Sequence, residues 1–131
     1  MRLEVERARV GRLCTIRPGG TPHVVPFCFS LEEEHLYWAV DAKPKREGRL
    51  QRLRNLDQDP RAVVLVDRWS EDWSELWWVR LEGRARTVEA AAERSHALGL
   101  LSAKYPQYRA QPPPGPVIRI DVERWSGWAG A

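Results

Sequence analysis

Residues 11–27, GRLCTIRPGGTPHVVPF, decide the fold because they predict two strands joined by a tight turn. The segment 12–16 is short and apolar, as expected for a strand that contributes to a core. Gly19 and Gly20 follow it closely, and glycine readily adopts the positive φ angles that tight turns require. The two strands should therefore pair as an antiparallel hairpin.

The returning strand of this hairpin is predicted over 22–31, PHVVPFCFSL. Both of its faces are substantially apolar, so we expect it to be covered on both sides. Pro22 and Pro26 lack the N–H group that a strand ladder needs. The strand should therefore lie at an edge, a bend or a bulge of the sheet.

Hydrophobic patterning predicts the remaining elements. Alternation over 76–88 indicates a long strand with one face in water. Pro106 should stop the second main helix, and the proline-rich run after it, QYRAQPPPGP, should be a stiff surface linker. The other predicted strands are 35–40, 61–68 and 116–128, and the predicted helices are a brief one over 3–8, a short one after the third strand and a longer one over 89–105.

Six strands joined by tight turns favour an antiparallel sheet, which can curl into a small barrel and so remove exposed edges. The 131 residues are enough for one domain, 1–131, with a single core. No apolar run approaches the ~20 residues that span a bilayer, and the N-terminus has no apolar signal region. We expect a cytoplasmic protein that does not bind membranes.

The connection after the third strand concentrates the positive charge. Residues 43–54 contain six cations and one acid, whereas the whole chain has a net charge of only +3. Lys45, Arg49 and Arg52 are spaced i, i+4, i+7, so they would share one side of a helix. Such a local cluster favours an anionic small molecule over nucleic acid, because arginine can bind phosphate through two hydrogen bonds. The alternative is a solvated charged face.

The seven tryptophans are the second unusual feature. Trp38 and Trp77 are expected in the core or in a dimer interface. Trp69, Trp73 and Trp78 flank an acidic loop or lie on the polar face of the long strand, where an aromatic side chain can stack on a flat ring. The histidines and cysteines show no metal-binding spacing, so we expect no metal.

Taken together, these segments resemble the pyridoxamine 5′-phosphate oxidase-like split β-barrel family. The resemblance is carried by the hairpin, by the Lys/Arg-rich segment ending in RNLDQDPRAVVLV and by the long strand. Within that family, DAKPKR, WSEDWSELWWVR and VERWSGW look most like the branch that binds the deazaflavin coenzyme F420. The implied fold is mainly β: a six-stranded antiparallel split β-barrel with one short helix after strand 3 and a longer helix before the last strand.

The resemblance also implies a homodimer with two cofactor sites at the subunit interface. The cofactor phosphate would meet the basic segment, and its tricycle would pack along the second and third strands. Trp78 is a further candidate for lining the site. The implied cofactor-binding residues are Val25, Pro26, Phe27, Ala39, Val40, Lys43, Lys45, Arg46, Arg49, Arg52 and Trp78.

The function that this resemblance implies is hydride transfer between coenzyme F420 and a small organic substrate. Because the cofactor supplies that chemistry, no catalytic side chain is expected. One alternative is an FMN-binding oxidoreductase of the same fold, since FMN and F420 share a tricycle, a ribityl chain and a phosphate. Another is a non-catalytic protein that stores the cofactor or binds haem. The chain ends in RWSGWAGA and lacks the Arg-Leu tail of true pyridoxine-phosphate oxidases, which argues against that substrate.

Overall fold

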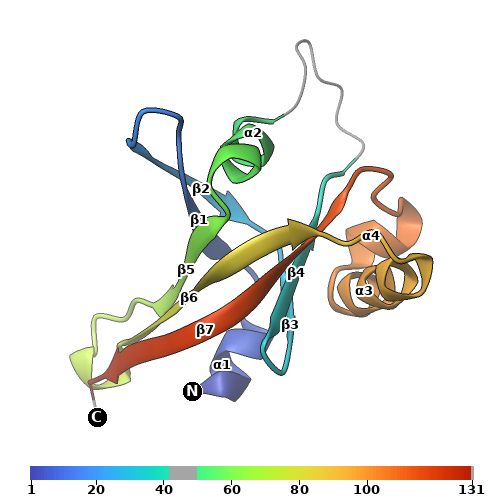
Figure 1. Ribbon diagram of the computed structural model, residues 1–131. Helices are drawn as coiled ribbons and strands as arrows, with labels where there is room; N and C mark the ends of the chain where they lie inside the picture. The colour runs from blue at the N-terminus through green and yellow to red at the C-terminus, as the bar shows by residue number, and fades with distance from the viewer. Residues whose placement is uncertain (42–49, 131) are drawn as a thin grey trace.

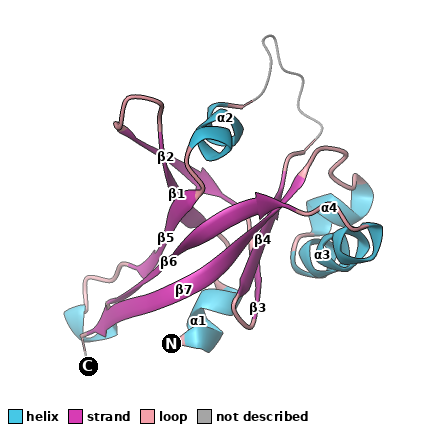
Figure 2. Ribbon diagram, viewed as in Figure 1, coloured by secondary structure: helices cyan, strands magenta, loops and turns pink. Residues whose placement is uncertain are grey.

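Seven antiparallel strands form one sheet that curls into a half-barrel, as the computed structural model shows for residues 1–41 and 50–130 (Figures 1 and 2). The predicted mainly β fold is confirmed, with seven strands instead of six. The strand order is β2-β1-β5-β6-β7-β4-β3. The strands are β1 (Gly11–Ile16), β2 (Pro22–Phe27), β3 (Ser30–Glu32), β4 (His35–Ala39), β5 (Arg61–Arg68), β6 (Trp77–Thr87) and β7 (Val117–Ala129).

The first two strands form the predicted hairpin, in which Cys14 lies opposite Val24. Gly19 and Gly20 both have a φ angle of +99°, which explains why glycine is required in this turn. Among the described residues β2 pairs only with β1, so it is an edge strand, as its prolines predicted.

The prediction of a single strand over 22–31 is wrong, because the chain changes partners near Phe29. β2 pairs with β1, whereas β3 pairs with β4. Between them, the Tyr105 hydroxyl accepts a hydrogen bond from Phe29 N at 3.1 Å and lies 3.1 Å from Phe29 O, to which it can donate. A side chain thus satisfies backbone groups that no strand pairs. That tyrosine is 76 residues further along, so local sequence gives no sign of the break.

The helices lie outside the sheet or at its end.

The prediction of an extended linker after Pro106 is partly wrong, because a short helix begins there. Proline stops the preceding helix but is tolerated at the first position of the next one, where its missing N–H leaves no intrahelical bond unmade. The helices are α1 (Arg2–Arg7), α2 (Gln51–Gln58), α3 (Ala91–Lys104), α4 (Pro106–Ala110) and the 3-10 helix η1 (Trp73–Glu75).

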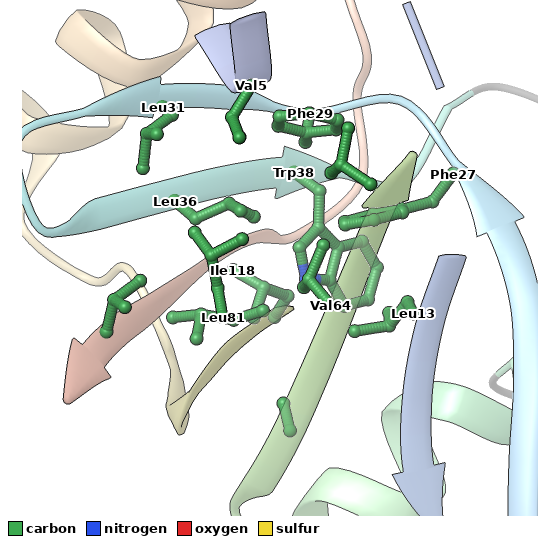
Figure 3. Close-up of a cluster of buried hydrophobic side chains, with 14 of the residues drawn as sticks. Val5, Leu13, Phe27, Phe29, Leu31, Leu36, Trp38, Val64, Leu81 and Ile118 are labelled. Atoms are coloured by element: carbon green, nitrogen blue, oxygen red, sulfur yellow. The ribbon is translucent and has the colours of Figure 1, made fainter. Parts of the chain in front are cut away.

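The main core fills the inside of the half-barrel (Figure 3). Leu36 and Trp38 of β4 point inward to meet aliphatic side chains from β1, β5, β6 and β7, and Trp38 is only 1% exposed, which confirms its predicted core position. Tyr37 and Ala39 face outward, where α3 covers them. β4 is therefore covered on both faces, and its C-terminal end lies beside the β2 edge and α2.

The long strand β6 shows the predicted alternation. Val79 and Leu81 are buried, whereas Arg80 and Arg84 are exposed. Within the described ranges, no helix combines the length and apolarity needed to cross a membrane.

Candidate functional site

A small pocket lies where the ends of β2 and β4 meet α2 and α4. We call it the β2–β4 pocket, and its volume is about 170 Å³. Three strand residues predicted to hold a tricycle line it, together with one helix residue predicted to hold phosphate. The lining residues are Pro26, Phe27, Cys28, Trp38, Ala39, Asp41, Arg52 and Tyr108. Of the predicted site residues, the structure therefore brings together Pro26, Phe27, Ala39 and Arg52.

Val25 and Val40 lie next to this pocket without lining it, since both pack against the main core. The Val40 backbone is fully used: its N–H donates to Pro116 O and its carbonyl accepts from Gly115 N, each at 3.0 Å. A Cβ at Gly115 would lie 2.7 Å from Val40 O, so only glycine allows this approach. These two valines therefore lie between the pocket lining and the main core.

Trp78 lies elsewhere in the structure. It is near the start of β6, opposite Asp67 of β5 and Trp128 of β7. The Arg80 guanidinium lies over its ring at 5.2 Å. The structure does not bring Trp78 to the β2–β4 pocket.

Four of the predicted phosphate-binding residues, Lys43, Lys45, Arg46 and Arg49, lie outside the described residues. Their alignment with Arg52 therefore stays a prediction. The part of the basic segment that the structure describes begins at Leu50, and it forms α2.

α2 holds Arg52 in place through an apolar and a polar contact. Leu53 is 4% exposed and packs into the main core, as the predicted leucine stripe requires. Asn55 is fully buried and donates a hydrogen bond to the Thr15 hydroxyl of β1 at 2.9 Å. Gln51 donates in turn to the Asn55 side-chain oxygen at 2.6 Å. This chain of hydrogen bonds fixes the rotation of the helix and hence the direction of Arg52.

Arg52 is the cation of the pocket. Its guanidinium lies over the Trp38 ring, 5.1 Å from the ring centre. Its Nε is buried without a hydrogen-bond partner, and within the described residues it forms no ion pair. Burial lowers the pKa of Arg52, and the nearby Asp41 carboxylate opposes that shift. A desolvated guanidinium with unused donors is suited to bind an incoming anion.

Aromatic rings form the apolar side of the pocket. Phe27 meets Trp38 edge to face, with ring centres 6.4 Å apart, and stacks on Phe29 at 5.5 Å. The pocket thus combines rigid aromatic surface with the Arg52 guanidinium, and the Asp41 carboxylate is part of the same lining. That combination suits a ligand that is flat and apolar at one end and anionic at the other.

Sequence reasoning missed the wall contributed by α4 and by the break between β2 and β3. Tyr108 packs against Tyr105 with ring centres 5.6 Å apart, and the Cys28 thiol lies within hydrogen-bonding reach of Tyr108. Burial raises the pKa of Tyr108 to about 12, so its phenol stays a neutral donor at physiological pH. The i, i+3 spacing of the two tyrosines across Pro106 was the available signal for a short helix there.

A larger hollow of about 760 Å³ lies on the outer face of β6 and β7; we call it the β6–β7 hollow. Three arginines line it, but each lies close to a carboxylate. Arg119 contacts Glu93 at 2.6 Å and Asp121 at 2.7 Å. The others are weaker pairs, Arg84 with Glu123 and Arg86 with Asp121, at 3.7 and 3.5 Å. Mutual neutralisation makes this hollow a poor anion site despite its size.

Comparisons with known proteins identify the family and the fold. The family model described as pyridoxamine 5′-phosphate oxidase matches residues 1–129. A FAD-binding protein from Mesorhizobium loti has a similar structure, with a TM-score of 0.69, 27% identity, and coverage of 97% of this chain and 91% of that one. A comparison with curated protein sequences finds no match.

Two further structures share the fold at lower identity. The conserved hypothetical protein Rv2991 from Mycobacterium tuberculosis has a TM-score of 0.76 and 24% identity, with coverage of 96% of this chain and 80% of that one. The haem storage protein HutZ from Vibrio cholerae has a TM-score of 0.73 and 14% identity, with coverage of 98% and 92%. At these identities the likeness shows the fold alone.

Proposed function

Because the chain belongs to the pyridoxamine 5′-phosphate oxidase family, we propose that it binds a tricyclic, phosphate-bearing cofactor and works as an oxidoreductase. The cofactor we propose is the deazaflavin coenzyme F420, with FMN as the alternative. When bound, such a cofactor supplies hydride chemistry, here toward a small organic substrate. The side chains of this protein would bind and orient the cofactor and exclude water from it.

The observation that carries this proposal is the Arg52 guanidinium, whose Nε is buried without a hydrogen-bond partner, in a pocket walled by Phe27 and Trp38. Arg52 would bind the phosphate, and Pro26, Phe27 and Ala39 would pack against the tricycle. The predicted contributions of Lys43, Lys45, Arg46 and Arg49 would add positive charge around the same phosphate. Both parts of the cofactor thus find a chemically matching surface.

The preference for F420 over FMN is supported by the amount of positive charge. F420 carries an anionic lactyl–oligoglutamate tail in addition to its phosphate, and residues 43–54 hold six cations. One phosphate needs fewer. The structural similarity to a FAD-binding protein keeps a flavin as the alternative, because FAD and FMN contain the same tricycle.

We also propose that the protein works as a homodimer. The β2–β4 pocket, at about 170 Å³, is smaller than the ~300–1,000 Å³ typical of pockets that bury a cofactor-sized ligand. A second subunit laid across it would supply the missing wall. Trp78, which lies outside the pocket of its own subunit, is available for the site of the other.

Haem storage is supported less well. The structural similarity to a haem storage protein is at 14% identity and extends to the fold alone. Among the described residues, no histidine lines the β2–β4 pocket, so an imidazole ligand for haem iron is not provided there.

The proposal is tested by titrating the purified protein with F420 and with FMN and following tryptophan fluorescence. We expect quenching by F420 at lower concentration than by FMN. Tight binding of FMN alone would replace the F420 assignment with the flavin alternative. The double variant Lys45→Glu, Arg49→Glu should abolish binding while leaving the circular dichroism spectrum unchanged, and unchanged affinity would show that the phosphate lies elsewhere.

Catalysis is tested separately. Reduced cofactor is mixed with the protein and a panel of activated alkenes and quinones, and its reoxidation is followed by absorbance. Turnover of at least one compound is expected from an oxidoreductase. Tight binding without any turnover would instead favour a protein that stores or carries the cofactor.

A further inference from the structure

We propose that Tyr108 is a second, neutral donor to the oxyanion that Arg52 binds, so that α2 and α4 hold one phosphate group between them. Assigning that phosphate to a flavin-type cofactor rests on the proposed function. The subsite itself rests on the two side chains and on the pocket that they share.

The first support is the position of Arg52. Its Nε is buried and unpartnered, although arginine carries five N–H donors that usually find acceptors in folded proteins. The aromatic ring of Trp38 lies under the guanidinium and offers no strong acceptor. An oxyanion entering the pocket would meet donors that are already desolvated and held in place by α2.

The second support is the position of Tyr108. It lines the same pocket from the opposite helix and lies close enough to Arg52 for the two side chains to interact electrostatically. Its neighbour Tyr105 has a structural role, because its hydroxyl is used by the Phe29 backbone. The Cys28 thiol, within reach of the Tyr108 hydroxyl, is a weak hydrogen-bonding partner, and Asp41 is near enough to interact with Tyr108 electrostatically. The phenol can therefore turn its O–H toward a better acceptor.

The chemistry of phosphate explains why a charged donor, Arg52, would be combined with a neutral donor, Tyr108. Phosphate accepts several hydrogen bonds, and a guanidinium supplies charge as well as donors. A second cation in the small pocket would repel Arg52, whereas a phenol that stays protonated adds a donor without charge. Asp41 lines the same pocket and its carboxylate would repel an anion, so the phosphate should sit toward the side shared by Arg52 and Tyr108.

The experiment compares ligands with and without phosphate. The protein is prepared free of cofactor in phosphate-free buffer, and fluorescence titrations are run with FMN and riboflavin, which differ only in the phosphate. If F420 is the ligand that binds, F420 and its dephosphorylated tricycle–ribityl fragment replace them. Inorganic phosphate alone is the third probe, with the thermal unfolding midpoint as the readout.

The variants are Tyr108→Phe and, as a matched control, Tyr37→Phe. Tyr37 also has a pKa raised to about 12 by burial, but its hydroxyl donates to Glu93 at 2.8 Å, outside the pocket. Tyr108→Phe should weaken binding of the phosphate-bearing ligand roughly tenfold, as loss of a hydrogen bond to a charged group does. Binding of the phosphate-free ligand should change less than about twofold, since it lacks that acceptor. The control should change neither affinity.

The outcomes separate this subsite from the cofactor assignment. Equal weakening of both ligands would place Tyr108 against the tricycle and overturn the subsite, and so would unchanged affinity for both. Stabilisation by inorganic phosphate that disappears in Tyr108→Phe and in Arg52→Gln supports the subsite even if no tricyclic cofactor binds. In that case the proposed function fails and the oxyanion subsite stands.

Discussion

Among the described residues, the β6–β7 hollow and the β2–β4 pocket differ in the partners that their arginines have. In the β6–β7 hollow, Arg119 is held by two carboxylates, and its neighbours have carboxylates within reach. In the β2–β4 pocket, Arg52 is more desolvated and forms no ion pair within the described part of the chain. The β6–β7 hollow contains more cations, but the β2–β4 pocket contains the arginine whose Nε has no hydrogen-bond partner. The proposed site therefore rests on an unsatisfied donor and not on volume or the number of cations.

The difference between paired and unpaired arginines also distinguishes residues that stabilise the fold from residues available to bind a ligand. A paired arginine stabilises the fold that contains it, whereas a desolvated, unpaired arginine is unfavourable until a ligand arrives. Proteins retain such unfavourable groups where binding or catalysis needs them. Two variant pairs compare the regions directly, and two further variants test the support beneath Arg52 and the nearby Lys104.

The largest expected effect is on cofactor affinity. Arg52→Gln should weaken binding of the phosphate-bearing cofactor by about 3 kcal/mol, or two orders of magnitude, because it removes a desolvated charge partner. Arg84→Gln, in the β6–β7 hollow, should leave affinity within about twofold, since Arg84 already faces Glu123. Fluorescence titration measures both. Equal losses would mean that the cofactor contacts both hollows and that the comparison drawn here is wrong.

The next effect concerns the support beneath Arg52. Asn55→Ala should lower the free energy of unfolding by about 1–3 kcal/mol, because the buried Thr15 hydroxyl loses its partner. It should also weaken cofactor binding, since α2 would no longer be fixed in rotation. Urea unfolding and titration give the two readouts. Gln58→Ala, at the exposed end of the same helix, is the control and should change both by little.

The third prediction reverses the sign between the two regions. Arg119→Met should destabilise the protein by about 1–2 kcal/mol, because Glu93 and Asp121 lose their shared cation. Arg52→Met should be neutral or slightly stabilising, because it removes a half-buried charge whose Nε has no hydrogen-bond partner in the cofactor-free protein. Both are measured by chemical unfolding without ligand. A clear loss of stability in Arg52→Met would show that Arg52 has a structural partner after all.

Much of the fold could be predicted from local sequence, because its signals are local. The hairpin depends on Gly19 and Gly20, whose φ angles the turn requires. The buried and wet faces of β6 follow from period-two alternation. The break at Phe29 could not be predicted, because it depends on the Tyr105 hydroxyl arriving from another helix. Long-range side-chain contacts of this kind leave no local pattern.

The candidate site was predictable in part for the same reason. Charge clustering and helical spacing singled out Arg52, and the family resemblance added the β2 and β4 residues that line its pocket. Tyr108 was missed because a proline-rich segment was expected to be extended, although Pro106 occupies a position where helices accept proline. The sequence does not show which arginines form ion pairs with carboxylates in the folded protein. These ion pairs are what distinguish the two hollows.

The smallest expected effect tests a third cation, Lys104, which lies beside the β2–β4 pocket wall. Its Nζ donates to Phe29 O at 2.9 Å and lies 4.0 Å from the centre of the Phe29 ring. Burial lowers the pKa of Lys104 from 10.5 to about 8. Between pH 8 and 10 the unfolded chain therefore holds a proton that the folded protein has largely released, so the free energy of unfolding should rise with pH.

The expected rise is about 1 kcal/mol after allowing for partial exposure of Lys104, and it can be followed by urea unfolding from pH 7 to 10. Above pH 10 the trend should reverse, because Tyr37, Tyr105 and Tyr108, with pKa values near 12 in the folded protein, keep protons that the unfolded chain loses. Lys104→Met should remove the rise below pH 10 and leave the fall above it. A rise that persists in Lys104→Met would assign the titration to another group. Lys104 would then be a cation whose charge is compensated in the folded protein, like Arg119 of the β6–β7 hollow and unlike Arg52.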